Sequence, residues 1–124
     1  MSASKNSAKS RLLPKSTKDL LKDHVLGADY ELSLAWVSPE RMHELNLLYR
    51  GKDKPTNVLS FPLSETEGEI LLCAEQMSDA EVIPLFIHGL LHLKGMRHGS
   101  RMENEERRVV NFLILNATNH RRRP

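Results

Sequence analysis

The sequence lacks several features that would place the protein outside the reducing interior of a cell. Its 124 residues include only one cysteine, Cys73, so no disulfide can form within the chain, and reduced surroundings are compatible with this composition. No apolar run reaches the length of a membrane span, and the lysine-rich stretch 1–18 has no apolar segment resembling a signal peptide. These absences predict a cytoplasmic protein that does not associate with a membrane.

A strong charge imbalance is also missing, because the formal net charge is only +2. The basic residues instead gather at the two ends of the chain. We therefore expect residues 1–15 to form a flexible basic arm and residues 120–124 a basic tail. With 40% hydrophobic and 27% charged residues, the intervening stretch 16–119 is expected to fold as one soluble domain.

Hydrophobic periodicity predicts a mixture of helices and strands. Alternating or continuous apolar residues favour strands, and apolar residues three or four apart favour helices. The expected strands are 30–37, 57–61 and 69–73, and the first three expected helices are 16–26, 39–50 and 81–94. A last helix is expected to begin at the capping box of residues 100–103 and to have its buried side at residues 109–114. In the second helix, capped by Ser38 and started by Pro39, we expect Met42, Leu45, Leu48 and Tyr49 to face the sheet. The predicted fold is α/β (α+β): a single compact domain with a small mixed sheet of three to four strands packed against helices.

Three histidines within eleven residues form the most specific pattern in the chain. His88 and His92 are four residues apart, so on a helix both imidazoles can reach one ion. Gly95 can adopt positive φ and turn the chain back, which would bring His98 to the same ion. Three neutral imidazoles leave one open position on a tetrahedral zinc, as in catalytic sites. We therefore predict that His88, His92 and His98 bind one Zn²⁺ per chain.

The helix that carries the first two histidines is predicted to be buried. Apolar residues cover nearly its whole circumference between positions 81 and 94, and Pro84 falls in the first turn, where a missing N–H costs little. Polar imidazoles inside such a helix need partners, and a metal ion would supply them.

A zinc peptidase is one alternative interpretation of the histidine spacing. Peptidases with this spacing carry a glutamate directly after the first histidine, whereas this chain has Gly89 there. Another carboxylate, such as Glu69, would have to act as the general base. A second alternative is a non-catalytic, metal-stabilised module that binds RNA or the ribosome. A fourth protein ligand, such as His120 or Cys73, would favour this second alternative.

A basic turn follows the second helix. Arg50, Lys52 and Lys54 lie in a stretch whose glycine, aspartate and proline cannot extend that helix. A guanidinium can donate paired hydrogen bonds to phosphate oxygens, and lysines can attract a phosphate backbone. For Arg50, the simpler interpretation from these residues is a cation near the C-terminal end of the helix dipole. The alternative is that Arg50 acts on a phosphate group while Lys52 and Lys54 bind a phosphate backbone. Thr56 and Ser60 could line the same cleft.

Two separate segments resemble the YbeY family of bacterial rRNA-maturation endoribonucleases. Residues 88–98, HGLLHLKGMRH, are similar to the family signature H-G-x-L-H-L-x-G-x-D-H, and residues 50–62, RGKDKPTNVLSFP, to its second signature. Gly68-Glu69-Ile70 is similar to the family's G-D-I motif, and the resemblance covers roughly residues 30–115. Two departures stand out, since Arg97 replaces the usual aspartate before the last histidine, and Asn57 stands where aspartate is common.

The resemblance implies a compact α/β fold, in which residues 16–119 form a zinc-hydrolase domain. It implies that the three histidines hold zinc, and that Arg50 is the family's functional arginine. The implied activity is cleavage of single-stranded RNA in maturation of the 3′ end of small-subunit rRNA and in ribosome quality control. The implied partners are single-stranded RNA, in particular rRNA, and the ribosome or its small subunit.

Overall fold

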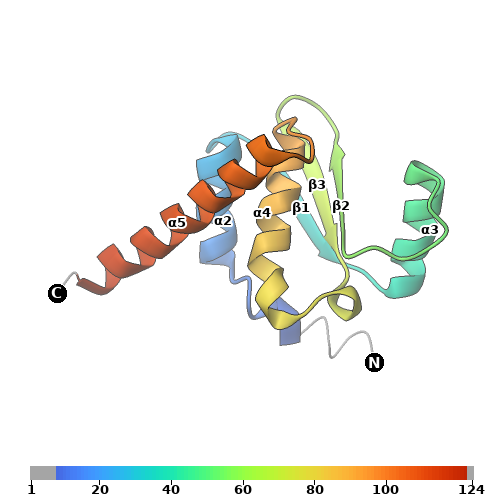
Figure 1. The fold of residues 1–124 in the computed structure, drawn as a ribbon, viewed down its shortest axis with the longest axis horizontal. Coiled ribbons are helices and arrows are strands. Elements are labelled where there is room, and N and C mark those ends of the chain that lie inside the picture. The colour runs from blue at the N-terminus through green and yellow to red at the C-terminus, as the bar shows by residue number, and fades with distance from the viewer. Residues whose placement is uncertain (1–7, 123–124) are drawn as a thin grey trace.

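A three-stranded mixed sheet forms the centre of the molecule (Figure 1). The computed structural model describes the backbone of residues 8–122 and the side chains of residues 8–117. The strands are β1 (Glu31–Trp36), β2 (Val58–Pro62) and β3 (Glu67–Leu72), and their order in the sheet is β1-β3-β2. β1 runs parallel to β3, whereas β2 runs antiparallel to it. The sheet is therefore mixed, as predicted, with β3 at its centre and β2 at an edge.

Helices cover both faces of this sheet. Helices α2 (Lys15–Leu26), α4 (Val82–Leu93) and α5 (Ser100–Arg122) lie on one side, and α3 (Pro39–Arg50) lies on the other (Figure 1). The side chains of successive residues in β3 point to opposite faces of the sheet. Ile70 and Leu72 pack in a core with α2, α4 and α5, and Leu71 packs in a second core with α3. The α/β prediction is confirmed, and the predicted central position of β3 follows from burial on both faces.

The packed domain begins earlier than the sequence suggested. Leu13 is buried against the main core, and a helical turn occupies residues 8–10. The described part of the expected flexible arm therefore includes a core residue. Residues 1–7 lie outside the described part of the chain, as do the side chains of the expected C-terminal tail, 120–124.

Helix α3 differs from its prediction in the residues that it buries. Ser38 accepts a hydrogen bond from the Arg41 N–H, as expected of a cap, and Met42 and Leu45 are buried. Asn46 completes the buried stripe, whereas Leu48 is 72% exposed and Tyr49 is 62% exposed. The expected burial of these last two residues was wrong. Tyr49 follows Met42 by about two turns on the same side of the helix, but the sheet does not cover this last turn of α3.

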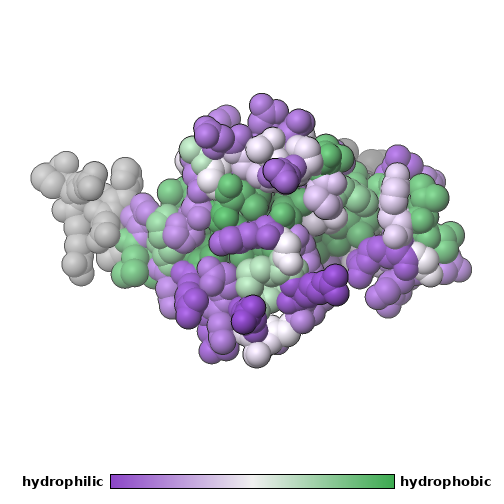
Figure 2. All heavy atoms as spheres, turned by 90° about the horizontal axis from the view of Figure 1, so that it is seen from above, coloured by the Kyte–Doolittle hydropathy of each residue, from purple (hydrophilic) through white to green (hydrophobic). Residues whose placement is uncertain are grey.

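Several exposed apolar side chains occur on helices α3 and α5. Figure 2 shows apolar side chains at the end of the molecule formed by α3, where Leu47 and Leu48 are exposed. Ile114 and Leu115 are exposed on the outer half of α5. None of the helices among residues 8–122 combines the length and apolar character needed to cross a membrane.

Candidate metal centre and its cleft

Helix α4 places His88 and His92 one turn apart beside the edge of the sheet. Its apolar side chains are buried around them, including Phe86, Ile87 and Leu91. The two imidazoles are only partly buried, because they line a cleft on the side of α4 that faces β2. Burial of the helix thus fixes the positions of both histidines while leaving their rings accessible.

The chain reverses directly after α4 and brings the third histidine back. Gly95 has a φ of 100°, and the N–H of the next residue, Met96, donates to the carbonyl of Leu91 at 3.0 Å. This turn brings the His98 ring within 4.8 Å of the His88 ring and 4.7 Å of the His92 ring, measured between centroids. The predicted reversal at Gly95 is present, and one potential ligand nitrogen from each of the three histidines lies within 4.8 Å of the others.

The hydrogen-bonding surroundings favour a metal ion between the rings. The His92 Nδ1–H can donate to the Met96 carbonyl at 3.0 Å, and His88 Nδ1 faces the Glu106 carboxylate at 3.5 Å. With both Nδ1 atoms protonated, the two Nε2 atoms carry lone pairs, yet they lie only 3.1 Å apart. Two nitrogens about 2.0–2.1 Å from a tetrahedral zinc would lie about 3.3–3.4 Å apart. The donor set therefore fits zinc, which would replace lone-pair repulsion by two bonds.

The electrostatics of the cluster also favour neutral imidazoles. Burial lowers the pKa of His88, and the neighbouring His92 and His98 lower it further, while Glu106 opposes this shift. Burial likewise lowers the pKa of His92, with smaller contributions from His98 and Arg50 in the same direction. Since only the unprotonated nitrogen can bind a metal ion, these pKa shifts keep both residues ready to bind at neutral pH.

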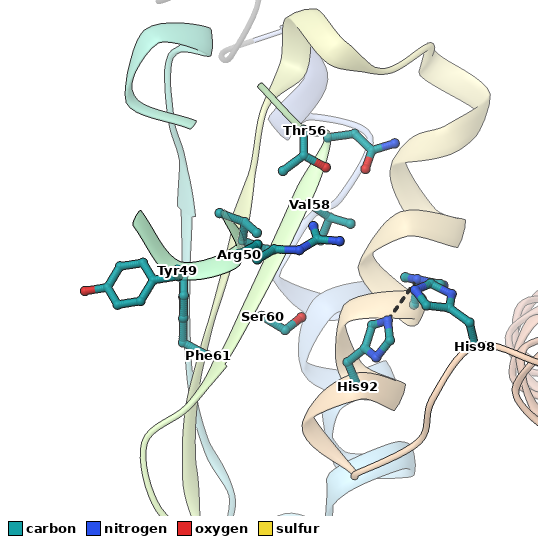
Figure 3. A pocket seen from close by; sticks show the side chains of 11 residues that line it. Tyr49, Arg50, Thr56, Val58, Ser60, Phe61, His92 and His98 are labelled. Atoms are coloured by element: carbon teal, nitrogen blue, oxygen red, sulfur yellow. Dashed lines mark hydrogen bonds between the residues drawn. The ribbon is translucent and has the colours of Figure 1, made fainter. Parts of the chain in front are cut away.

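A cavity of about 730 Å³ joins the histidine cluster to the end of α3 (Figure 3). In Figure 3 the Arg50 side chain extends over β2 toward the histidines. Its charge contributes to the lowered pKa of His92, which is consistent with this orientation. The other lining residues are Tyr49, the three histidines and the consecutive stretch 56–61 of β2 and its preceding loop. One cleft thus holds three histidines that could bind a metal ion on one side and a guanidinium on the other.

The basic loop after α3 is held by hydrogen bonds to that helix. The buried side chain of Asn46 donates to the Lys54 carbonyl at 2.8 Å, and His43 pairs with Asp53 at 2.6 Å. The side chains of Lys52 and Lys54 are exposed and are not among the residues that line the cavity. Of the predicted basic residues, Arg50 faces the histidines, and the two lysines lie on the outer surface of the loop.

Gly89 stands at the position that carries the general base in peptidases with the same histidine spacing, and a side chain there would meet close neighbours. A Cβ at Gly89 would lie 3.0 Å from Ile70 Cδ1 and 3.1 Å from Ser60 Oγ. This close approach also lets the Ser60 hydroxyl donate to the Gly89 carbonyl at 3.1 Å, which fastens α4 to β2. Glu69, the substitute base considered from the sequence, lines a different cavity, outside the histidine cleft.

A fourth protein ligand is absent among the side chains of residues 8–117 that the structure describes. The group there that could hold a metal ion consists of the three histidines alone, and Cys73 is buried in the core beside α3. Burial raises the pKa of the Cys73 thiol, as expected of a structural cysteine. The side chain of His120 lies outside the described residues.

The positions of two side chains at this site were not predicted from the sequence. Nothing in the local sequence pattern singles out Glu106, yet it is partly buried and its carboxylate faces His88. Tyr49 was expected in the core, but its ring lines the outer end of the cleft and meets Phe61 edge-on. Both depend on how elements distant in the sequence cross one another.

Comparison with known proteins agrees with this geometry. The family model described as Endoribonuclease YbeY matches residues 2–118. An endoribonuclease YbeY of Rubrobacter xylanophilus is 43% identical over 95 residues, covering 73% of this chain and 70% of that protein. One from Paraburkholderia phymatum is 34% identical over 119 residues, covering 84% and 78%. The solution structure of TM1509 from Thermotoga maritima aligns with a TM-score of 0.57 at 25% identity, covering 90% of this chain and 87% of that one.

Proposed function

Because this chain belongs to the endoribonuclease YbeY family, we propose that it is a zinc-dependent endoribonuclease that cleaves single-stranded RNA. The observation that carries the proposal is the cleft in which three convergent histidines face Arg50. A cation site and a guanidinium on opposite walls suit a phosphodiester, whose charge increases during cleavage.

His88, His92 and His98 would hold the zinc ion. When bound, zinc would act as a Lewis acid toward a phosphoryl oxygen and would lower the pKa of a coordinated water toward about 7. Glu106 and the Met96 carbonyl would hold two of the imidazoles in the tautomer whose Nε2 is free to bind.

Arg50 would bind and stabilise the phosphate. A guanidinium is planar and can donate two parallel hydrogen bonds to phosphate oxygens. The hydrogen bonds that fix the loop to α3 support this role, because they hold the backbone that follows Arg50. A positioned cation of this kind stabilises the negative charge that develops in the transition state.

Lys52 and Lys54 would attract the RNA backbone from the rim of the cleft. Their ammonium groups are exposed, so their contribution would be sensitive to salt and insensitive to sequence. In the cell, we propose a cytoplasmic role in maturation of the 3′ end of small-subunit rRNA and in ribosome quality control, with the ribosome or small subunit as the partner.

The peptidase alternative has less support. A peptidase needs a carboxylate that can reach a water molecule beside the metal, whereas Gly89 has no side chain and packs closely against Ile70 and Ser60. Hydrolysis of unstructured peptides by the purified protein, without cleavage of RNA, would favour the peptidase over our proposal.

An RNA cleavage assay tests the proposal directly. Matched single-stranded and duplex RNAs are incubated with the protein, with the protein plus a chelator, and with the chelated protein after addition of zinc. We expect cleavage of the single strand only, loss with the chelator and recovery with zinc. Analysis of the product termini then distinguishes attack by water from attack by the RNA 2′-hydroxyl. Cleavage that continues unchanged in the chelated, metal-free protein would contradict the proposal.

Metal analysis tests the ligand assignment independently of activity. We expect about one zinc per chain in the wild type and loss of that zinc in His92→Ala. His24→Ala is a matched control, since His24 is exposed and stacks on Phe112 outside the cleft. Equal zinc content in wild type and His92→Ala would overturn the assignment.

A further inference from the structure

An exposed aromatic pair lies at the outer end of the cleft. The Tyr49 and Phe61 rings meet edge-on, with centroids 5.1 Å apart and planes inclined by 65°. Phe61 is partly buried against the core beside α3, whereas Tyr49 is 62% exposed. Phe61 therefore supports the Tyr49 ring from one side, and solvent reaches the rest of that ring.

Both rings line two cavities. One is the cleft that contains the histidines and Arg50, and the other is a hollow of about 540 Å³ beside α3. Val37, Leu45, Pro62 and Leu71 supply apolar surface to this second hollow. The aromatic pair thus lies where the catalytic cleft continues into a mostly apolar space.

The direction of the side chains fits an extended ligand. Tyr49 and Arg50 are consecutive at the end of α3, so they project about 100° apart around the helix. In Figure 3, Arg50 points toward the histidines, and the Tyr49 ring points away from them toward the outside. A chain molecule with one group at the guanidinium can therefore place a neighbouring group at the aromatic ring.

We propose that Tyr49, supported by Phe61, is a base-stacking site for a nucleotide next to the cleaved phosphate. This inference rests on the proposed ribonuclease function and specifies how the substrate is held. Every nucleobase has an aromatic face that can stack on tyrosine, so the site would bind bases with little sequence preference.

Such a site would also explain a preference for single strands. In a duplex each base is stacked between its neighbours and paired, so it cannot turn outward onto a protein ring without losing those interactions. A nucleotide in a single strand has no pairing partner and loses fewer stacking interactions when its base turns outward. The aromatic pair would therefore select unpaired RNA, while Arg50 and the metal centre would act on the backbone.

Fluorescent RNA tests this inference without depending on cleavage. A single-stranded RNA decamer carries 2-aminopurine, whose fluorescence is quenched on stacking, at one position at a time. It is mixed rapidly with excess zinc-loaded protein, and the fluorescence is read before the RNA is cleaved. We expect quenching at one position with the wild type and with Tyr49→Phe, and none with Tyr49→Leu. Tyr49→Leu should weaken RNA binding about 5- to 150-fold, the usual effect of losing one base–aromatic stack. Leu48→Ala is the matched control, because Leu48 is exposed on the same turn and lines neither cavity.

An abasic substitution separates stacking from a purely structural effect. RNA that lacks the base at the quenched position should bind the wild-type protein as weakly as intact RNA binds Tyr49→Leu. The same abasic RNA should bind Tyr49→Leu no more weakly than intact RNA does. If the abasic RNA and the Tyr49→Leu substitution each reduced RNA affinity and the two reductions added, the inference would be wrong. Tyr49→Leu with the same RNA affinity and the same quenching as the wild type would also overturn it. Cleavage by the wild type without any quenched position would also reject the stacking site while leaving the ribonuclease proposal intact. Quenching without cleavage would reject the ribonuclease proposal instead.

Discussion

Glu106 Oε1 lies 3.5 Å from Nδ1 of His88, and the two side chains come from helices that are separated by the turn at Gly95. The carboxylate is 34% exposed and the imidazole 22% exposed, so this contact is partly shielded from water. A carboxylate in this position fixes the tautomer and orientation of a metal-binding histidine. We therefore expect Glu106 to position His88 at the proposed zinc site.

Substitution of Glu106 should weaken zinc binding without removing it. We expect Glu106→Gln to lower zinc affinity about 10- to 100-fold, because a neutral amide holds His88 less strongly. Competition with a chelator of known affinity measures this change independently of RNA cleavage. Glu105→Gln is the control, since Glu105 pairs with Arg108 at 3.2 Å on the same helix. Equal zinc affinity in Glu106→Gln and Glu105→Gln would contradict the assigned role.

Arg50→Ala should separate catalysis from metal binding. We expect the variant to fold and to keep its zinc, because Arg50 is exposed and is not a ligand. Its rate of RNA cleavage should fall on the order of 10²- to 10³-fold, as when a single donor to transition-state charge is removed. Arg50→Lys should recover only part of that loss, since an ammonium cannot donate in the same paired geometry. Arg107→Ala serves as the control, and full activity in Arg50→Ala would refute the catalytic role.

Asn46→Ala should destabilise the protein and loosen the basic loop. Its side chain is fully buried and donates to the Lys54 carbonyl at 2.8 Å, so the substitution leaves a loop carbonyl without this partner. We expect a loss of about 1–3 kcal/mol in the free energy of unfolding, measured with urea. Asp53→Asn weakens the exposed contact from His43 to the same loop. This second change should stay within about 0.5 kcal/mol, so similar losses in the two variants would contradict the prediction.

The histidine cluster predicts how the stability of the metal-free protein depends on pH. Burial lowers the pKa of His88 and His92 in the folded state, whereas both titrate near 6.5 when unfolded. Below about pH 6.5 the unfolded chain therefore binds more protons than the folded chain. Stability should be highest above that pH and should fall as the pH decreases toward the folded-state pKa values. Urea unfolding of the metal-free protein between pH 8 and pH 5 measures the slope.

A double variant provides the control for this pH dependence. Replacing both histidines, His88→Gln with His92→Gln, removes the two titrating groups and should flatten this part of the pH profile. An unchanged slope in the double variant would assign the pH dependence to other groups.

Local sequence patterns predicted most of the fold. Period-two and period-3.6 apolar residues indicated all three strands and the helices α2 to α5, because each element must bury one face or stripe. Ser38 and Pro39 indicated where α3 begins, and Gly95 indicated the reversal after α4. These features are local, so a short stretch of sequence contains all the information that they require.

The sequence alone also predicted that the three histidines lie close together, since their convergence depends only on one helical turn and the turn at Gly95. Tertiary structure decided what surrounds them. Glu106 reaches His88 only because α5 packs against α4, and Tyr49 remains exposed because the sheet ends before the last turn of α3. A periodic pattern shows which side of an element is apolar, but the partner that covers each part of that side is fixed only when distant segments pack together.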